Sequence, residues 1–156
     1  HVLPHPQYKT LIFLGHLLFL GVALLLQTWN VFAGYTKPDF ILVFLLISAL
    51  FLDFPKIFLM ILVSIFFLSW RPNYNLDLLA FALLPILAFL LRKFIHGRIE
   101  LIGFLTVFFG TIIFYSVSAL QSFWSNLGLA GELMIWNLVF GSLVFFVMLR
   151  FLNPSR

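Results

Sequence analysis

Residues 37–57 read KPDFILVFLLISALFLDFPKI, a charge-free apolar run between two short polar segments. Each polar segment combines an Asp, a Pro and a Lys, as KPD at 37–39 and as DFPK at 53–56. Asp is a favoured N-cap, and Pro is tolerated only before a helix or in its first turn. The stretch therefore predicts one short apolar helix over 40–52 and the beginning of a second helix directly after it.

The whole chain repeats this alternation of apolar runs and polar gaps. It has 156 residues, of which 63% are hydrophobic and 9% charged. Six apolar runs occupy 10–31, 40–52, 57–70, 78–91, 101–120 and 133–149. A water-soluble domain of this size cannot bury so much apolar surface, whereas charge-free runs are typical of membrane spans. We predict an all-α polytopic membrane protein, with residues 1–156 forming one compact bundle of six transmembrane helices.

The second, third and fourth runs are shorter than a full span. The run at 40–52 gives about 20 Å of helix, against a hydrocarbon core of about 30 Å. Two interpretations are open. Either all six runs cross a locally thinned bilayer, or 40–52 and 57–70 form a re-entrant hairpin. The orientation of the later runs is the same in both, because a hairpin counts as zero or two crossings.

Positive charge is distributed unevenly between alternate gaps. One parity holds only Lys37 and Arg71. The other parity holds the remaining basic residues, Lys9, Lys56, Arg92, Lys93, Arg98, Arg150 and Arg156. The tryptophans lie at the gaps poor in Lys and Arg instead: Trp29 and Trp70 are near or at the ends of runs, Trp124 lies in a gap and Trp136 is just inside a run. Because Lys and Arg favour the cytoplasmic side and Trp the membrane interface, we predict that both termini are cytoplasmic.

The basic rim also suggests which partners the chain meets. The chain has a formal net charge of +4, and the basic residues on the predicted cytoplasmic side favour contact with anionic membrane lipids. No basic face with interleaved aromatic residues occurs, so we predict no nucleic-acid binding. The first run is followed by a passable cleavage pattern, VFA before Gly34. It is nevertheless longer than the usual core of a signal peptide, so we expect this span to be retained.

Few polar side chains fall inside the runs. His16 lies in the middle of the first run, and we predict a neutral imidazole bonded to a neighbouring helix. Asn137 is the side chain that we most expect to bond across helices, and we include it among the residues predicted to bind a partner. Arg92, Lys93 and Arg98 form a basic cluster, either a topology anchor or a docking site for an acidic partner segment or lipid. The acidic residues Asp39, Asp53, Asp77 and Glu132 lie at helix ends, where capping explains them.

No arrangement of residues indicates catalysis. The apolar runs contain no carboxylate pair, and the chain has no Gly-rich phosphate loop and no nucleophile elbow. The chain also has no cysteine, which excludes thiol chemistry and disulfides. We therefore predict a protein that is not an enzyme and that has no catalytic residues, no cofactor and no metal site.

Three short segments carry a family resemblance. The first run ends in LLQT at 25–28, KPDFILV at 37–43 opens the second, and LLRK at 90–93 ends the fourth in basic residues. This order resembles MreD, the small integral membrane protein of the bacterial rod-shape (elongation) complex. The resemblance implies a non-enzymatic scaffold for cell shape and cell-wall biogenesis in the bacterial cytoplasmic (inner) membrane. Its implied partners are an MreC-like protein and, through it, the MreB filament and the wall-synthesis enzymes.

One part of the chain departs from that family. The stretch SIFFLSWRP at 64–72 lacks the Asp and the Ser-Gly-x-x-Gly segment that the family usually has in its third helix.

A second interpretation concerns the outer ends of the runs. Polar and aromatic side chains gather there and can line a pocket, namely Gln27, Asn30, Trp70, Asn73 and Tyr74. The six-run layout is also similar to the substrate-binding S component of energy-coupling-factor transporters. That resemblance implies uptake of a small, vitamin-like molecule. The first run lacks the family's Ala-x-x-x-Ala pattern, since 14–23 reads LGHLLFLGVA.

Overall fold

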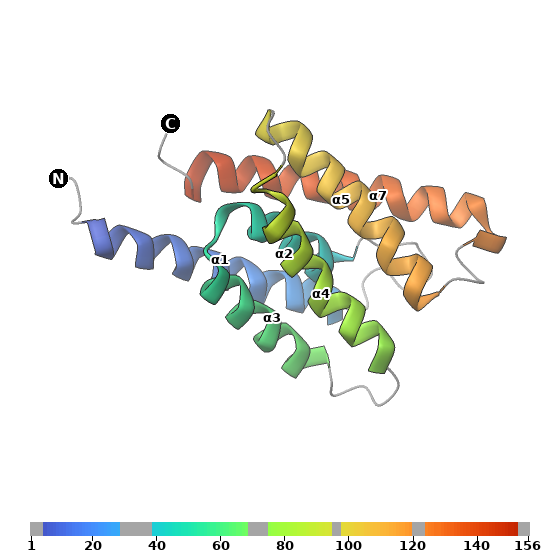
Figure 1. Cartoon of the computed structure of the whole chain (residues 1–156), viewed down its shortest axis with the longest axis horizontal. Coiled ribbons are helices and arrows are strands. Elements are labelled where there is room, and N and C mark those ends of the chain that lie inside the picture. Colours follow the sequence, from blue (N-terminus) through green and yellow to red (C-terminus); the bar gives the residue numbers. More distant parts are fainter. Residues whose placement is uncertain (1–4, 29–38, 69–74, 95–97, 120–123, 153–156) are drawn as a thin grey trace.

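A computed structural model describes the structure of residues 5–28, 39–68, 75–94, 98–119 and 124–152. Within these ranges the chain forms six helices of more than ten residues (Figure 1), namely α1 His5–Thr28, α2 Phe40–Phe51, α3 Phe54–Leu68, α4 Asn75–Leu91, α5 Ile99–Ser118 and α7 Leu127–Val147. A π-helical turn, η2 Met148–Leu152, continues α7. Over the described residues the prediction of an all-helical chain is confirmed.

The helix lengths divide into two groups, as the sequence predicts. Three segments are long and apolar enough to cross a membrane, namely Lys9–Thr28, Ile99–Ser118 and Leu127–Arg150. The second, third and fourth helices are apolar but shorter. The three long helices point to membrane association.

The last long helix begins earlier than the sequence predicts. We expected the run to begin at 133, but α7 begins at Leu127. The physical reason is a local cap. The side-chain oxygen of Asn126 accepts a hydrogen bond from the Leu129 backbone N–H at 3.1 Å, which starts the helix upstream of the apolar run, at 127 instead of 133.

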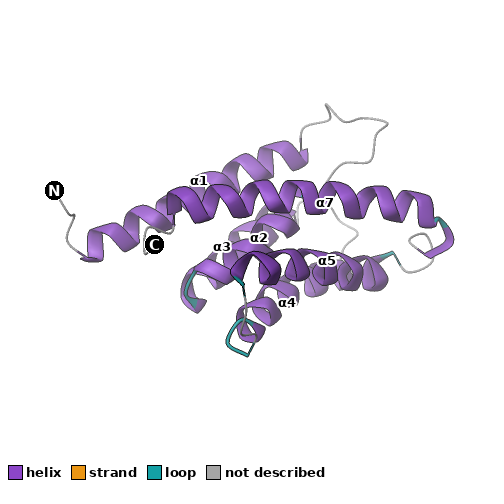
Figure 2. Ribbon diagram, turned by 90° about the horizontal axis from the view of Figure 1, so that it is seen from above, coloured by secondary structure: helices purple, strands orange, loops and turns teal. Residues whose placement is uncertain are grey.

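Helix α2 lies at the centre of the bundle. Every side chain from Phe40 to Ala49 is buried, and α2 contacts each of the other five helices. Seen from above, it lies between α1 and α4 (Figure 2). Because the other five helices enclose it, α2 forms the core around which they pack.

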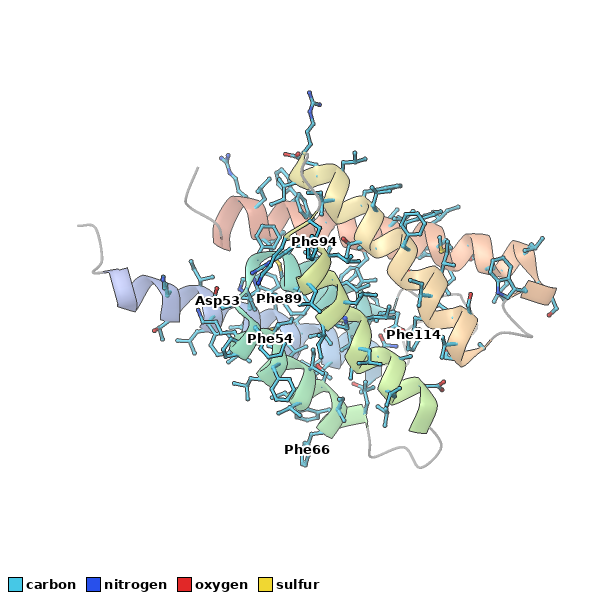
Figure 3. All side chains as sticks on the ribbon, viewed as in Figure 1. Asp53, Phe54, Phe66, Phe89, Phe94 and Phe114 are labelled. Carbon is cyan, nitrogen blue, oxygen red and sulfur yellow. The ribbon has the colours of Figure 1, made fainter. Side chains whose placement is uncertain are left out.

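The outer helices each bury one face and turn large apolar side chains outward. Leu18 on α1 is 68% exposed, Phe66 on α3 is 61% exposed and Phe146 on α7 is 65% exposed. Phe66 points away from the bundle at the end of α3 (Figure 3). An apolar surface that extends over several helices is unfavourable in water and is the surface expected against lipid.

Glycines bring α5 and α7 close to their neighbours. A Cβ atom added at Gly103 on α5 would lie 2.7 Å from the Phe145 ring of α7. One added at Gly141 on α7 would lie 3.0 Å from Val107 of α5. Small residues at such contacts allow two helix backbones to approach closely, which is how helices without a hydrophobic driving force gain packing energy.

Candidate functional site

The N-terminal end of α2 is fixed by side chains from other helices. Asp39 is the N-cap, and its Oδ1 accepts from the Leu42 N–H at 3.3 Å. The Asp39 N–H donates to Asn137 Oδ1 on α7 at 2.7 Å, and the Phe40 N–H donates to Gln27 Oε1 on α1 at 2.9 Å. The first N–H groups of a helix have no partner within the helix, so these three side chains supply the acceptors that α2 lacks.

Helix α5 completes this polar network. The buried Asn137 also donates, through Nδ2, to the Thr111 hydroxyl at 3.2 Å. The Tyr115 hydroxyl donates to Asp39 Oδ2 at 3.4 Å. Asn137 therefore bonds across helices as expected, both to α5 and to the residue before α2. Partner binding by Asn137 stays a prediction.

A cavity of about 400 Å³ lies beside this network. Its polar lining comes from α1, α4, α5 and the beginning of α2, as Gln27, Thr28, Asp39, Asp77, Tyr115 and Ser118. The remaining lining is apolar and includes Phe67, Phe81 and Phe114. Its volume falls in the range of small-molecule sites, which are mostly apolar with a few convergent polar groups.

Of the five residues predicted to line an outer pocket, the structure describes one. Gln27 lines the cavity. Asn30, Trp70, Asn73 and Tyr74 lie outside the described residues.

Sequence reasoning missed two carboxylates of this cavity, Asp39 and Asp77. Both were interpreted only as helix caps. One signal was available, since each begins a helix at a gap poor in Lys and Arg, which places both at the same end of the bundle. Tyr115 and Ser118 carried no signal, because a polar residue near the end of an apolar run has many roles.

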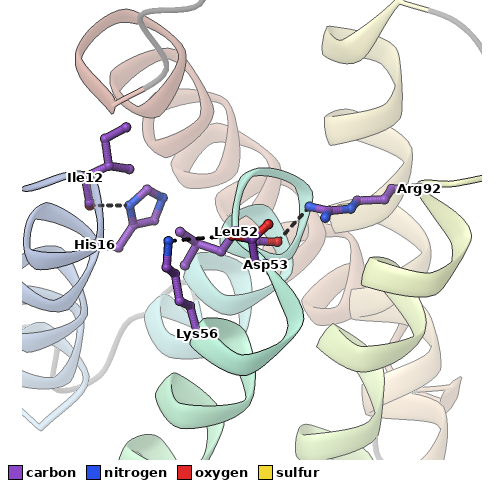
Figure 4. Close-up of polar contacts among 6 residues, drawn as sticks. All are labelled: Ile12, His16, Leu52, Asp53, Lys56 and Arg92. Carbon is purple, nitrogen blue, oxygen red and sulfur yellow. Dashed lines mark hydrogen bonds and ion pairs between the residues drawn. The ribbon is translucent and has the colours of Figure 1, made fainter. Parts of the chain in front are cut away.

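The opposite end of α2 is held by Arg92, which follows α4. Arg92 Nη1 donates to the carbonyl oxygen of Ala49 at 2.9 Å and to that of Leu52 at 2.8 Å, and Figure 4 shows the bond to Leu52. Its guanidinium lies 4.3 Å from the centre of the Phe89 ring. The last carbonyls of a helix lack partners within the helix and attract a cation, so Arg92 acts as a C-terminal cap supplied by another helix.

The surroundings of Arg92 also affect its titration. Partial burial lowers the pKa of the Arg92 guanidinium, and the nearby Asp53 carboxylate opposes the shift. An arginine begins so far above neutral pH that the group stays charged.

The predicted basic cluster thus divides into two kinds of residue. Arg92 is half-buried and bonded to α2, whereas Lys93 and Arg98 are exposed. Lys93 Nζ lies 5.6 Å from the centre of the Phe89 ring. Docking of a partner or lipid on this cluster stays a prediction, and the two exposed residues are those whose charge is presented outward.

His16 differs from its prediction. The ring is buried, and Nδ1 donates to the Ile12 carbonyl oxygen of its own helix at 2.8 Å (Figure 4). The predicted bond to a neighbouring helix was wrong, because the carbonyl four residues earlier lies within reach of the ring. Its Nε2 atom is buried and has no partner among the described residues. Beside it, Lys56 and Asp53 form an ion pair at 3.6 Å.

Within the described ranges, no group of three or more His, Cys, Asp or Glu residues is arranged to hold a metal ion.

Comparisons with protein-family models, with curated proteins and with solved structures find no match for this chain. The resemblances to MreD and to the S component therefore stay predictions, and a function has to be argued from the geometry.

Proposed function

We propose that the chain is a multi-pass protein of the bacterial cytoplasmic membrane, with six crossings and both termini in the cytoplasm. The ends of α2 support this orientation. Leu52, at the end of α2, is bonded to Arg92 of the basic cluster, whereas Asp39, at its beginning, shares a cavity with Asp77 at the far end of α4. Helix α2 thus extends from one end of the bundle to the other, which favours two crossings over a re-entrant hairpin.

The short length of α2 is compatible with crossing. A short helix exposed to lipid has to thin the bilayer or leave backbone groups in hydrocarbon. Helix α2 avoids both costs, because protein surrounds it and because side chains satisfy the backbone groups at each end.

Labelling of single cysteines tests this topology, and the chain has no native cysteine to interfere. We expect Asn73→Cys to react with an impermeant maleimide in intact cells. We expect His96→Cys and Asp53→Cys to react only after permeabilisation, since positive gaps face the cytoplasm. Labelling on the opposite sides would overturn the orientation, and an Asp53→Cys protein that reacts under neither condition would favour the hairpin.

For activity, the proposal is a non-enzymatic membrane scaffold that resembles MreD. The observation that carries it is a groove of about 310 Å³ between the long helices α5 and α7. Gly103, Gly141 and Ser142 line the groove, with Phe104 and Phe146 as its bulky lining residues. Gly103 and Gly141 are buried where α5 packs on α7, so the exposed Ser142 is the small residue that lets one further helix approach, and the occupant that we propose is a single transmembrane helix of a partner. The proposed partner is an MreC-like protein.

Filling the groove should release this partner. Ser142 is exposed and donates only to the Leu138 carbonyl of its own helix. We expect Ser142→Trp to reduce co-purification of an MreC-like protein at least tenfold, because the indole occupies the space of the partner helix. Leu143→Trp is the matched control, since Leu143 is 60% exposed and lies outside the groove lining. Unchanged co-purification with Ser142→Trp would contradict the docking site.

A second candidate function is small-molecule uptake, as in an S component. The cavity beside the N-terminal end of α2 favours it, because that end faces outward in the proposed topology. A cavity at that end is placed to receive a solute from outside the cell.

A further inference from the structure

We propose that a groove between α4 and α5 binds one anionic phospholipid, with an acyl chain along the groove and the headgroup phosphate at Arg92. The groove has a volume of about 160 Å³ and shares no lining residue with the two spaces described above. The inference rests on the proposed membrane location, and the proposed topology decides only that the lipid comes from the cytoplasmic leaflet.

The groove is apolar along its length. Among its described lining residues only Arg92 and Thr106 are polar, and α2 contributes Leu46 and Leu50. The walls carry bulky apolar side chains that are 42–54% exposed, namely Leu87 and Leu91 on α4, and Phe109 and Ile113 on α5. In a bilayer such a space does not stay empty, because unfilled space forfeits dispersion contacts and hydrocarbon chains surround it.

The shape of the groove favours an alkyl chain over a further helix. Close helix contact needs small residues on the surface that is approached. The glycine of this groove, Gly110, is buried against α2, where an added Cβ would lie 2.6 Å from Leu46 Cδ1. The exposed walls are Leu, Ile and Phe side chains. A helix is about 10–12 Å across and stays outside such walls, whereas a chain one methylene wide can enter between them.

The length of the groove fits one leaflet. On α4 the lining extends from Leu84 to Arg92, which is about 12 Å of helix, and on α5 from Ile102 to Ile113, about 16 Å. Half of the hydrocarbon core is about 15 Å thick. An acyl chain that follows the groove from Arg92 therefore reaches the middle of the bilayer, while its headgroup stays beside Arg92.

Arg92 retains donors that a phosphate can use. Its Nη1 atom supplies both bonds to the carbonyls of α2. The N–H groups of Nε and Nη2 have no partner among the described residues, and these two nitrogens form one edge of the guanidinium. Such an edge binds phosphate through two parallel N–H groups. The bonds to α2 and the Phe89 ring hold this edge in place before a lipid binds.

The charge at this end of the groove also favours an anion. Lys93 and Arg98 follow Arg92 and are both exposed. Residues 95–97, between them, contain no Asp or Glu. Basic residues near the membrane surface attract anionic headgroups, each contributing about 1 kcal/mol.

The carboxylates near this end do not reverse the sign. Asp53 lies close to Arg92, but its side chain is 71% exposed and is paired with Lys56 at 3.6 Å. Glu100 lines the other groove, between α5 and α7. Four basic side chains thus stand against two carboxylates, so an anionic headgroup gains more here than a zwitterionic one.

Lipid retention tests the proposal on the purified full-length protein. The protein is mixed in detergent with equal amounts of dioleoyl phosphatidylglycerol and dioleoyl phosphatidylcholine, and native mass spectrometry counts the lipids that stay bound. We expect one phosphatidylglycerol per chain, retained at least fivefold more often than phosphatidylcholine. Millimolar glycerol phosphate should not displace it, because that headgroup lacks the acyl chain. Equal retention of the two lipids, or displacement by glycerol phosphate, would overturn the proposal.

Filling the groove tests the place of the acyl chain. Thr106→Trp leaves every charge unchanged, and we expect it to reduce retention of phosphatidylglycerol at least tenfold. Leu101→Trp is the matched control, since Leu101 is 58% exposed on the same helix and lies outside the groove lining. If Thr106→Trp fails to fold, Leu87→Trp repeats the test from an exposed position on the α4 wall. Retention that the groove variants leave unchanged would contradict the site.

Charge variants test the place of the headgroup. Arg92→Lys keeps the charge but lacks the second edge of donors, so we expect retention to fall about fivefold. Lys93→Gln should lower it less, because Lys93 does not line the groove. Arg150→Gln is the matched control, since Arg150 is an exposed cation of η2 outside the groove lining. Retention that Arg92→Lys leaves unchanged, or that Arg150→Gln lowers as much, would reject Arg92 as the headgroup site.

Lipid binding and the proposed function fail independently. Retention is measured on purified protein, so it does not depend on orientation in the cell or on a partner helix between α5 and α7. Reversed cysteine labelling with selective lipid retention would keep the site and assign it to the outer leaflet. The expected labelling without lipid selectivity would reject the site and keep the topology.

Discussion

Replacing Asn137 by Leu is expected to lower the free energy of unfolding by about 1–3 kcal/mol. The buried Asn137 amide accepts from the Asp39 N–H at 2.7 Å and donates to Thr111. Leu has similar volume but no polar atom, so it leaves the partly buried Asp39 backbone N–H without its acceptor. An unsatisfied donor of this kind costs more than an average hydrogen bond contributes. The measurement is SDS-induced unfolding in mixed micelles, followed by tryptophan fluorescence.

The control lies on the same helix. Ser142→Ala removes a hydroxyl that is exposed and bonded only within α7. Its unfolding free energy should stay within about 0.5 kcal/mol of the original. If Asn137→Leu were equally mild, the network around the beginning of α2 would not hold the helix in place.

The second large effect is expected at Arg92. Arg92→Met keeps most of the apolar stem but removes the donor shared by the Ala49 and Leu52 carbonyls, and it removes the cation over Phe89. Hydrogen bonds from a charged donor are stronger than neutral ones, but Arg92 is only half-buried. We therefore expect a loss of about 1–2 kcal/mol in the same unfolding assay.

Lys93→Met separates this role from simple positive charge. Lys93 is adjacent to Arg92 and is exposed, and Lys93→Met removes the same charge from the same gap. We expect a change within about 0.5 kcal/mol, since surface charges contribute little. Arg92→Lys should fall between the two, because an ammonium lacks the planar fork of Arg. Equal losses for Arg92→Met and Lys93→Met would show that the cluster acts as charge alone.

The two predictions indicate how the short second helix is held. Its N-terminal groups are bonded to α1 and α7, and its C-terminal carbonyls to a residue beyond α4. In hydrocarbon no water is available to hydrogen-bond such groups, so side chains from other helices have to supply the partners.

The order and the type of the helices could be predicted from the sequence, because charge-free apolar runs between polar, proline-containing caps permit little else. The central position of α2 could not. All six runs are apolar, and lipid is as apolar as a protein core, so hydrophobicity does not separate a buried helix from one that faces lipid. The early start of α7 was missed because Asn126 caps a turn that lies outside the apolar run.

The candidate site was predictable only in part. Gln27 was expected at an outer pocket, and it lines the cavity. Asp39 and Asp77 were visible only as helix caps, because capping alone accounts for a carboxylate at a helix start. Their shared cavity depends on α2 and α4 lying side by side, which no local pattern specifies.

The sequence by itself thus determined the six apolar helices, the shortness of three of them and the charge asymmetry from which an orientation is predicted. These properties are local, since they follow from the composition of each run and its gaps. Only the tertiary structure decided that α2 is enclosed, that Arg92 caps it, and that Asn137 accepts from Asp39 at a separation of 98 residues. Contacts of that kind depend on which helices become neighbours, and packing rather than hydrophobicity makes that choice.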